Sequence, residues 1–148
     1  MSDAPPPGTA CSHVEHRVAF YETDAMGVVH HANYLRFFEL GRVRWLDEHD
    51  RPYVEYVDAG LHFAVTHAEL DYRRGARFDD RLRVLTWLSW VAGASLGMAY
   101  RIERGDEIIV VGRTEHAALN DQGRVRRIPR EDRRRLAALA VGEADKLG

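Results

Sequence analysis

The sequence predicts an α+β fold, in which a largely antiparallel five-stranded sheet wraps around one long helix. Residues 33–50 carry large apolar side chains at intervals of three and four, which is typical of an amphipathic helix. Four later segments alternate in the manner of strands and are joined by short turns, which favours antiparallel neighbours. The length of 148 residues and the 45% share of hydrophobic residues fit one domain with one core.

The first segment differs in composition from the rest. Residues 1–12 hold three prolines and small polar residues, so we expect a flexible tail before a single domain that spans residues 13–148. The tail lacks the apolar stretch of a signal peptide. An alternating pattern then predicts the first strand, from His13 to about Tyr21.

A polar loop separates this strand from the predicted helix. Asn33 is expected to cap the helix start, and Asp50-Arg51-Pro52 to end the helix. Gly41 lies in the middle, where glycine costs about 1 kcal/mol relative to alanine. We infer that the helix closely approaches something flat at this point, such as the sheet.

The remainder of the chain predicts four strands and a short helix. Turn signals stand at Gly105–Asp106 and at residues 121–123, and a terminal helix is expected from near Pro129. The expected strands are residues 61–74, 81–93, 95–105 and 107–120. The exposed edges of such a sheet must be covered, and pairing with a second copy would cover them.

Composition excludes several classes of protein. The formal net charge of −2 argues against a nucleic-acid or membrane surface as the main partner. Cys11 is the only cysteine, which excludes an internal disulfide framework and a multi-cysteine metal site. No stretch has the roughly 18–20 apolar residues of a transmembrane helix. We therefore expect a cytoplasmic enzyme or binding protein.

The loop before the helix is the densest group of polar residues. Asp24 lies just after a strand, Gly27 permits an unusual backbone conformation, and the backbone around His31 leads into the helix. Amides at a helix start are unpaired donors at the positive end of its dipole. A carboxylate near such donors suits acyl hydrolysis. It either attacks the acyl carbon or activates a water molecule, while the amides bind the developing oxyanion. The alternative is an ordinary turn with solvated histidines.

The residues of this loop and helix resemble a known signature. The segment reads FYETDAMGVVHHANYLRFFELGRVRWL. It resembles the hotdog-fold acyl-CoA thioesterases of the 4-hydroxybenzoyl-CoA thioesterase and YbgC-like family. The resemblance continues through LDYRRGARFDDRLRVLTWL and RVRRIPRE, and so covers residues 16–134. It implies a hotdog fold and thioester hydrolysis.

The resemblance also implies roles for individual residues. Asp24 matches the catalytic aspartate, and His31 matches a histidine near the thioester carbonyl whose backbone N–H donates to the oxyanion. His30 departs from the usual Tyr or Phe, and Met26 from the usual Gly or Ala, which leaves the acyl preference open. A second subfamily carries its carboxylate on the helix, where Glu39 is interpreted here as structural or pocket-lining. The substrate-binding residues expected in the loop and helix are Tyr21, Gly27, His30, Asn33 and Glu39.

Coenzyme A carries phosphates, which guanidinium groups bind well. Two arginine clusters are candidates for this contact, the first of which resembles the nucleotide-facing segment of the family. The first cluster comprises Arg73, Arg74 and Arg77, and the second comprises Arg124, Arg126 and Arg127. Either cluster, taken alone, is equally well explained as a solvated basic rim.

No cofactor or metal is expected. Adjacent histidines such as His30 and His31 rarely bind one ion together, and no Cys, Asp or Glu stands at standard ligand spacing from them. Neither a glycine-rich phosphate loop nor a G-x-S-x-G elbow is present.

The expected function is hydrolysis of an aliphatic or aromatic acyl-CoA by a homodimer or homotetramer with edge-to-edge pairing. A non-catalytic acyl-CoA-binding protein is one alternative. A hotdog enoyl-CoA hydratase is another, although its D-x-N-P-x-H element is absent. Acyl carrier protein in place of CoA, and Asp24 as nucleophile or as general base, stay open.

Overall fold

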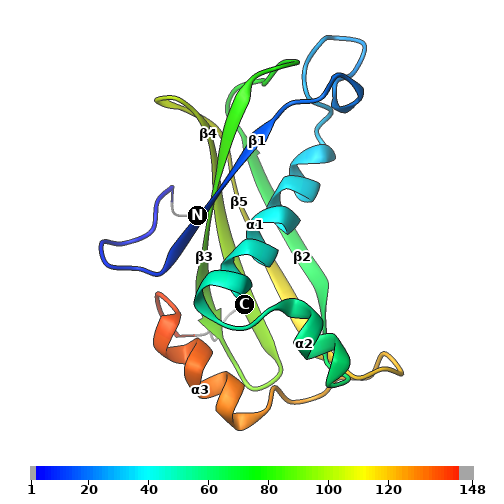
Figure 1. Cartoon of the computed structure of the whole chain (residues 1–148), viewed down its shortest axis with the longest axis vertical. Helices are drawn as coiled ribbons and strands as arrows, with labels where there is room; N and C mark the ends of the chain where they lie inside the picture. Colours follow the sequence, from blue (N-terminus) through cyan, green and yellow to red (C-terminus); the bar gives the residue numbers. More distant parts are fainter. Residues whose placement is uncertain (1–2, 144–148) are drawn as a thin grey trace.

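The computed structural model describes residues 3–143 of the chain and has a five-stranded sheet with one long helix (Figure 1). The elements in chain order are β1 (Cys11–Arg17), the 3-10 turn η1 (Phe20–Glu22), α1 (Asn33–His49), α2 (Tyr53–Asp58), β2 (His62–Tyr72), β3 (Arg81–Val91), β4 (Ser95–Arg104), β5 (Glu107–Leu119) and α3 (Arg130–Leu139).

The strands lie in the order β1-β3-β4-β5-β2, and every neighbouring pair is antiparallel. The β4–β5 hairpin turns at Gly105, whose φ of +58° lies in the left-handed region. The prediction of an α+β fold with a five-stranded antiparallel sheet is therefore confirmed. β1 and β2 form the two edges of the sheet, so each has one side that no other strand covers.

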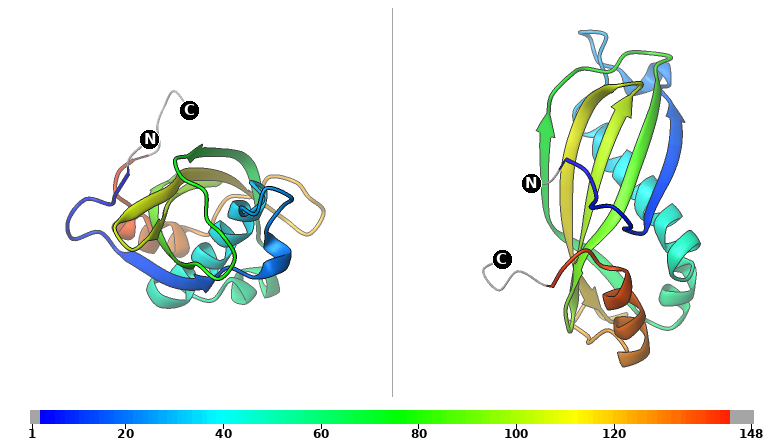
Figure 2. Two further views of the ribbon diagram at one scale, coloured as in Figure 1. Left: turned by 90° about the horizontal axis from the view of Figure 1, so that it is seen from above. Right: turned by 90° about the vertical axis from the view of Figure 1, so that its left-hand side faces the viewer.

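α1 lies along one face of the sheet, while the segment that leads into β1 passes over the opposite face (Figure 2). The contact between α1 and the sheet is closest at Gly41. A Cβ atom at this position would lie 2.1 Å from Thr86 Oγ1 and 3.2 Å from a methyl carbon of Val84, both on β3. The close approach inferred from the mid-helix glycine is confirmed.

The core lies between α1 and the sheet and is rich in aromatic rings. Phe38 of α1 stacks on Tyr100 of β4 with ring centroids 4.1 Å apart. Gly112 of β5 makes room for this ring, because a Cβ atom there would lie 2.6 Å from Phe38. Trp45 is fully buried and donates its Nε1 hydrogen to the backbone oxygen of Ala10 at 3.0 Å. These contacts fix the height of α1 above the sheet.

The first strand begins and ends earlier than expected. Cys11 and Ser12, assigned to the tail, belong to β1, since Cys11 is paired with Trp87 and Ser12 is only 1% exposed. Near its other end the strand stops at Arg17 rather than continuing to Tyr21. The chain turns there because the backbone N–H of Ala19 is bound by a side chain of η1 instead of a strand partner.

Two features of the helices also differ from expectation. Asn33 does not cap α1: it is the first helical residue, Ala32 holds the cap position, and no side chain caps the helix there. The short helix α2 was not anticipated, because six residues carry too little periodicity to identify it.

Within residues 3–143, no helix combines the length and apolar character needed to cross a membrane.

Candidate active site

The loop between η1 and α1 closes on itself in a tight turn. The backbone N–H of Asp24 donates to the oxygen of Val28 at 2.8 Å, and that of Gly27 donates to the oxygen of Asp24 at 2.9 Å. Gly27 adopts a φ of +80°, a conformation that other residues rarely take, which explains the glycine at this position. The loop therefore holds Asp24 in a defined place ahead of the helix.

The carboxylate of Asp24 is half-buried and bound on one side. Its Oδ1 accepts hydrogen bonds from the backbone N–H groups of Met26, at 2.9 Å, and Val28, at 3.4 Å. Within residues 3–143, its Oδ2 has no hydrogen-bond or ion-pair partner. One oxygen thus orients the group, and the other is available to a substrate or a water molecule.

The two histidines of the loop lie at the start of α1. Their rings stack with centroids 4.2 Å apart, and Nδ1 of His30 accepts the backbone N–H of Ala32 at 3.2 Å. The backbone oxygen of His31 accepts the hydroxyl of Tyr72 at 3.3 Å. No hydrogen-bond acceptor for the backbone N–H of His31 is present in the described part of the chain. This N–H is therefore available as a donor at the helix start, where the helix dipole favours negative charge.

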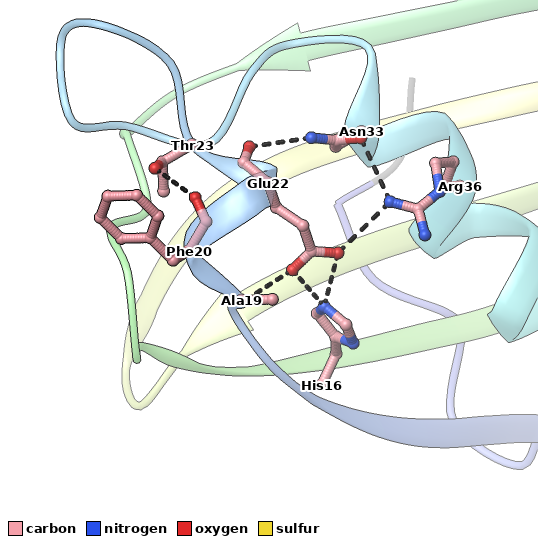
Figure 3. A network of polar contacts seen from close by, with 7 residues as sticks. All are labelled: His16, Ala19, Phe20, Glu22, Thr23, Asn33 and Arg36. Atoms are coloured by element: carbon pink, nitrogen blue, oxygen red, sulfur yellow. Dashed lines mark hydrogen bonds and ion pairs between the residues drawn. The ribbon is translucent and has the colours of Figure 1, made fainter.

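A buried carboxylate that the sequence did not single out lies beneath this loop. The side chain of Glu22 contacts Ala19, His16 and Arg36, and its backbone oxygen accepts a hydrogen bond from Asn33 (Figure 3). Its position two residues before Asp24 was the only available signal, since nothing in the spacing shows that the side chain points inward. Its partners come from β1 and α1, which only the folded chain brings together.

The structure places the other expected binding residues in different surroundings. Tyr21 is exposed beside the loop, and Asn33 uses both ends of its amide internally, donating to Glu22 at 2.8 Å and accepting from Arg36 at 3.3 Å. Glu39 lies six residues into α1, about 9 Å along the helix axis from its start. Its role, like that of Tyr21, stays a prediction.

A cavity of about 200 Å³ opens between α1 and the sheet, and Glu39 lines it. Phe63 and Val65 of β2 and His116 of β5 contribute to its largely apolar wall. Neither Asp24 nor His31 of the same chain lines this cavity. Within one chain the candidate catalytic loop is therefore separate from this cavity.

The first arginine cluster is not a free basic patch. Arg73 forms two hydrogen bonds with Asp3, at 2.7 and 2.8 Å, and a third with Asp71 at 3.0 Å, and Arg74 pairs with Glu107 at 3.3 Å. These bonds, first those with Asp3, raise the pKa of Arg73.

Arg77 differs from its neighbours. Its backbone pairs with Val28 in an isolated β-bridge, and its guanidinium approaches Gly27, with Nη1 3.4 Å from where a Cβ atom would be. It has no ion pair within residues 3–143. Of the first cluster, Arg77 is the member best placed to meet a ligand at the Asp24 loop.

The second cluster lies near α2, at the other end of α1. Arg126 donates to the backbone oxygen of Ala59 at 2.9 Å, and the guanidinium of Arg127 packs over Gly93.

Among the described residues, no group of three or more His, Cys, Asp or Glu side chains is arranged to hold a metal ion.

Comparisons with known proteins agree with this architecture. A chain from Aquifex aeolicus named a putative esterase is 33% identical over 115 residues, covering 78% of this chain and 89% of that protein. The acyl-CoA thioesterase YbgC of Haemophilus influenzae is 35% identical over 111 residues, covering 74% of this chain and 81% of that protein. The crystal structure of a hypothetical protein from Thermus thermophilus superposes with a TM-score of 0.83 at 33% identity, covering 89% of this chain and 99% of that one.

The family comparison covers most of the chain. Residues 18–138 match the thioesterase-like superfamily. This range includes the Asp24 loop, all of α1 and strands β2 to β5. The hotdog fold expected from the resemblance is confirmed. The chain therefore belongs to the thioesterase-like superfamily and is an enzyme of that family.

Proposed function

We propose that this protein hydrolyses acyl-CoA thioesters to a free acid and CoA, with Asp24 acting at the thioester carbonyl. One observation carries the proposal: among the residues that the structure describes, a single loop combines a carboxylate oxygen without a partner and a backbone N–H without an acceptor at the start of α1. The first suits attack on an acyl carbon or removal of a proton from an attacking water molecule, and the second suits a developing oxyanion. The named YbgC relative supports the choice of acyl-CoA as substrate.

Two mechanisms use these groups. As a nucleophile, Oδ2 of Asp24 bonds to the acyl carbon, the CoA thiolate leaves and takes up a proton, and water opens the resulting anhydride. As a general base, Asp24 takes a proton from a water molecule that attacks the carbonyl directly, and the CoA thiolate leaves and takes up a proton. We favour the nucleophile, because Oδ1 is held by backbone donors while Oδ2 faces no partner in the described chain.

A second copy of the chain would complete the site. β2 is an edge strand, and Tyr72 at one end of it binds His31 of the catalytic loop, whereas Phe63 and Val65 near its other end line the cavity. Antiparallel pairing of β2 with its copy about a two-fold axis sets opposite ends side by side. Each Asp24 loop would then lie beside the partner's cavity. We therefore propose a homodimer at least, or a homotetramer, with composite sites.

This arrangement also predicts the size of the acyl group and the residues that contact the phosphates of CoA. The cavity volume of about 200 Å³ is below the roughly 300–1,000 Å³ of most ligand sites, which favours a short acyl group. Arg77 of the same chain or the cluster Arg124–Arg127 of the partner would meet the phosphates. The absence of a cofactor and a cytoplasmic location stay predictions, as does the choice between CoA and acyl carrier protein.

The test is a thiol-release assay over a panel of aliphatic and aromatic acyl-CoA thioesters and the matching acyl carrier protein thioesters. We expect turnover that is highest for short acyl groups and is lost in Asp24→Asn. Binding of acyl-CoA without thiol release would favour the non-catalytic alternative. Consumption of an enoyl-CoA without thiol release would favour the hydratase.

Sedimentation at the assay concentration tests the composite site. We expect a dimer or tetramer, and a stable monomer with full activity would contradict it.

A further inference from the structure

The side chain of Glu22 is the most deeply buried carboxylate near the catalytic loop. The residue is 1% exposed, and its carboxylate is closed off from solvent. An ionised carboxylate in such a place is strongly destabilising unless donors surround it. Whether this carboxylate stays charged inside the protein therefore depends on the groups that contact it.

Three donors surround the carboxylate. Oε1 accepts the backbone N–H of Ala19 at 2.7 Å, and Nε2 of His16 lies 2.8 Å from Oε1 and 3.1 Å from Oε2. Arg36 Nη1 approaches Oε2 at 3.4 Å. Burial acts to raise the pKa of Glu22, but the hydrogen bonds from Ala19 and His16 and the charges of His16 and Arg36 outweigh it and lower this pKa. The group is therefore ionised at neutral pH.

The same residue also holds the far end of the loop. Its backbone oxygen accepts the N–H of His30 at 2.9 Å and the amide Nδ2 of Asn33 at 2.8 Å. Asp24 and His31 thus lie on the segment between Glu22 and Asn33, and the far end of this segment is hydrogen-bonded back to Glu22. We call the contacts of Glu22 with Ala19, His16, Arg36, His30 and Asn33 the Glu22 clamp.

We propose that Glu22 is a positioning residue of the active site, whose clamp sets where the Asp24 carboxylate and the His31 N–H lie relative to each other. This inference rests on the proposed function of Asp24. A carboxylate and an oxyanion donor must both reach one carbonyl, and a misplacement of about 1 Å costs about 100-fold in rate. Loss of the clamp therefore lowers the rate of the chemical step more than it weakens substrate binding.

The decisive variant is Glu22→Gln, which keeps the side-chain volume and removes the charge. Its matched control is Asp132→Asn, which changes a buried carboxylate in α3 that pairs with Arg51 at 3.0 Å and Arg135 at 2.6 Å, away from the loop. Both variants are compared with the wild type in thiol-release kinetics, thermal melting and hydrogen exchange of residues 23–32.

For Glu22→Gln we expect kcat to fall by about 10- to 100-fold, KM to change by less than about threefold, and exchange of residues 23–32 to accelerate. For Asp132→Asn we expect a lower melting temperature with kcat and loop exchange unchanged. A purely structural role of Glu22 would give the Asp132→Asn pattern instead, and that result would overturn the proposal.

A second variant keeps the test decisive if Glu22→Gln does not fold. Asn33→Ala removes one hydrogen bond to the Glu22 backbone from a partly exposed residue, and we expect a smaller fall in kcat with KM retained. Unchanged kcat and unchanged loop exchange in Asn33→Ala would then refute the clamp. Asp24→Asn separates the two hypotheses: if it retains full activity the proposed function fails, and if it is inactive while Glu22→Gln is normal only the clamp fails.

Discussion

A carboxylate with a fully buried side chain lies near each end of α1: Glu22 before the start of the helix and Asp50 after its end. Each accepts hydrogen bonds from an arginine and from a hydroxyl or backbone donor. At the far end, Asp50 accepts hydrogen bonds from the hydroxyl of Tyr56 and from Arg135. Asp132 completes this cluster by binding Arg135 and Arg51 through its two oxygens.

The difference between the two ends lies in what they leave unpaired. In the Asp50 cluster both oxygens of each carboxylate are bound, so the cluster joins α1, α2 and α3 and leaves no carboxylate oxygen for a ligand. Beside Glu22, the described chain leaves Oδ2 of Asp24 and the N–H of His31 without partners. We propose that buried charge stabilises the fold at one end of α1 and positions the Asp24 loop at the other.

The largest effect is expected at the reactive end. Asp24→Asn keeps the acceptor for Met26 and Val28 but removes the reactive carboxylate, so kcat should fall by at least about 10³-fold while the melting temperature is nearly unchanged. Thiol-release kinetics and thermal melting of one preparation measure both quantities. Retained kcat would remove Asp24 from the mechanism.

The next largest effect is expected at the structural end. Asp50→Ala leaves the Tyr56 hydroxyl and Arg135 without their acceptor and should lower the free energy of unfolding by about 3 kcal/mol. Urea denaturation measures this change, with the exposed Asp58→Asn as control. At a temperature where the variant is folded, its kcat should match the wild type. A parallel fall in kcat would contradict the division between the two ends.

A pH dependence of stability is expected from the middle of the core. Burial, and then the charge of Arg42, lower the pKa of His116 from 6.5 to about 4, so the unfolded chain binds this proton more readily than the folded one. Stability should therefore fall by about 2–3 kcal/mol as the pH drops from about 6.5 to 4. Denaturation of the wild type and of His116→Gln across this range measures the difference. Equal slopes would show that His116 does not titrate as described.

The smallest effect is expected at the basic rim of the loop. Arg77→Ala should raise KM for acyl-CoA by about three- to tenfold, more at low salt, with kcat nearly unchanged, because Arg77 has no ion pair within residues 3–143. Arg74→Ala is the control, since Arg74 already pairs with Glu107. If KM is unchanged in both, Arg124→Ala is the next variant to measure.

The features that the sequence predicts correctly are those with a local pattern. Alternation and turn residues locate the five strands, and helical spacing locates α1. Gly41 predicts a close approach, because glycine in mid-helix needs a packing reason, and Thr86 is that reason. Asp24, Gly27 and His31 lie together in one short loop, so the candidate site can be identified from the sequence alone.

The features that it misses depend on contacts between distant segments. Glu22 reads as an ordinary residue of a turn until β1 brings His16, and α1 brings Arg36, to its carboxylate. Asn33 resembles a cap, but its amide binds Glu22 across the loop. The ion pairs of Arg73 and Arg74 likewise join residues that are far apart in sequence, so an apparent basic cluster proves to be largely neutralised.

The central claim is that the unbound oxygen of Asp24 attacks the thioester. A single turnover in oxygen-18 water, with enzyme in excess and mass spectrometry of the peptide that contains Asp24, tests it most directly. Attack by Oδ2 followed by water opening the anhydride at the aspartyl carbon leaves label in the Asp24 carboxylate, and this is the result we predict. Label found only in the released acid would contradict this route and would leave direct attack by water, or opening of the anhydride at the acyl carbon.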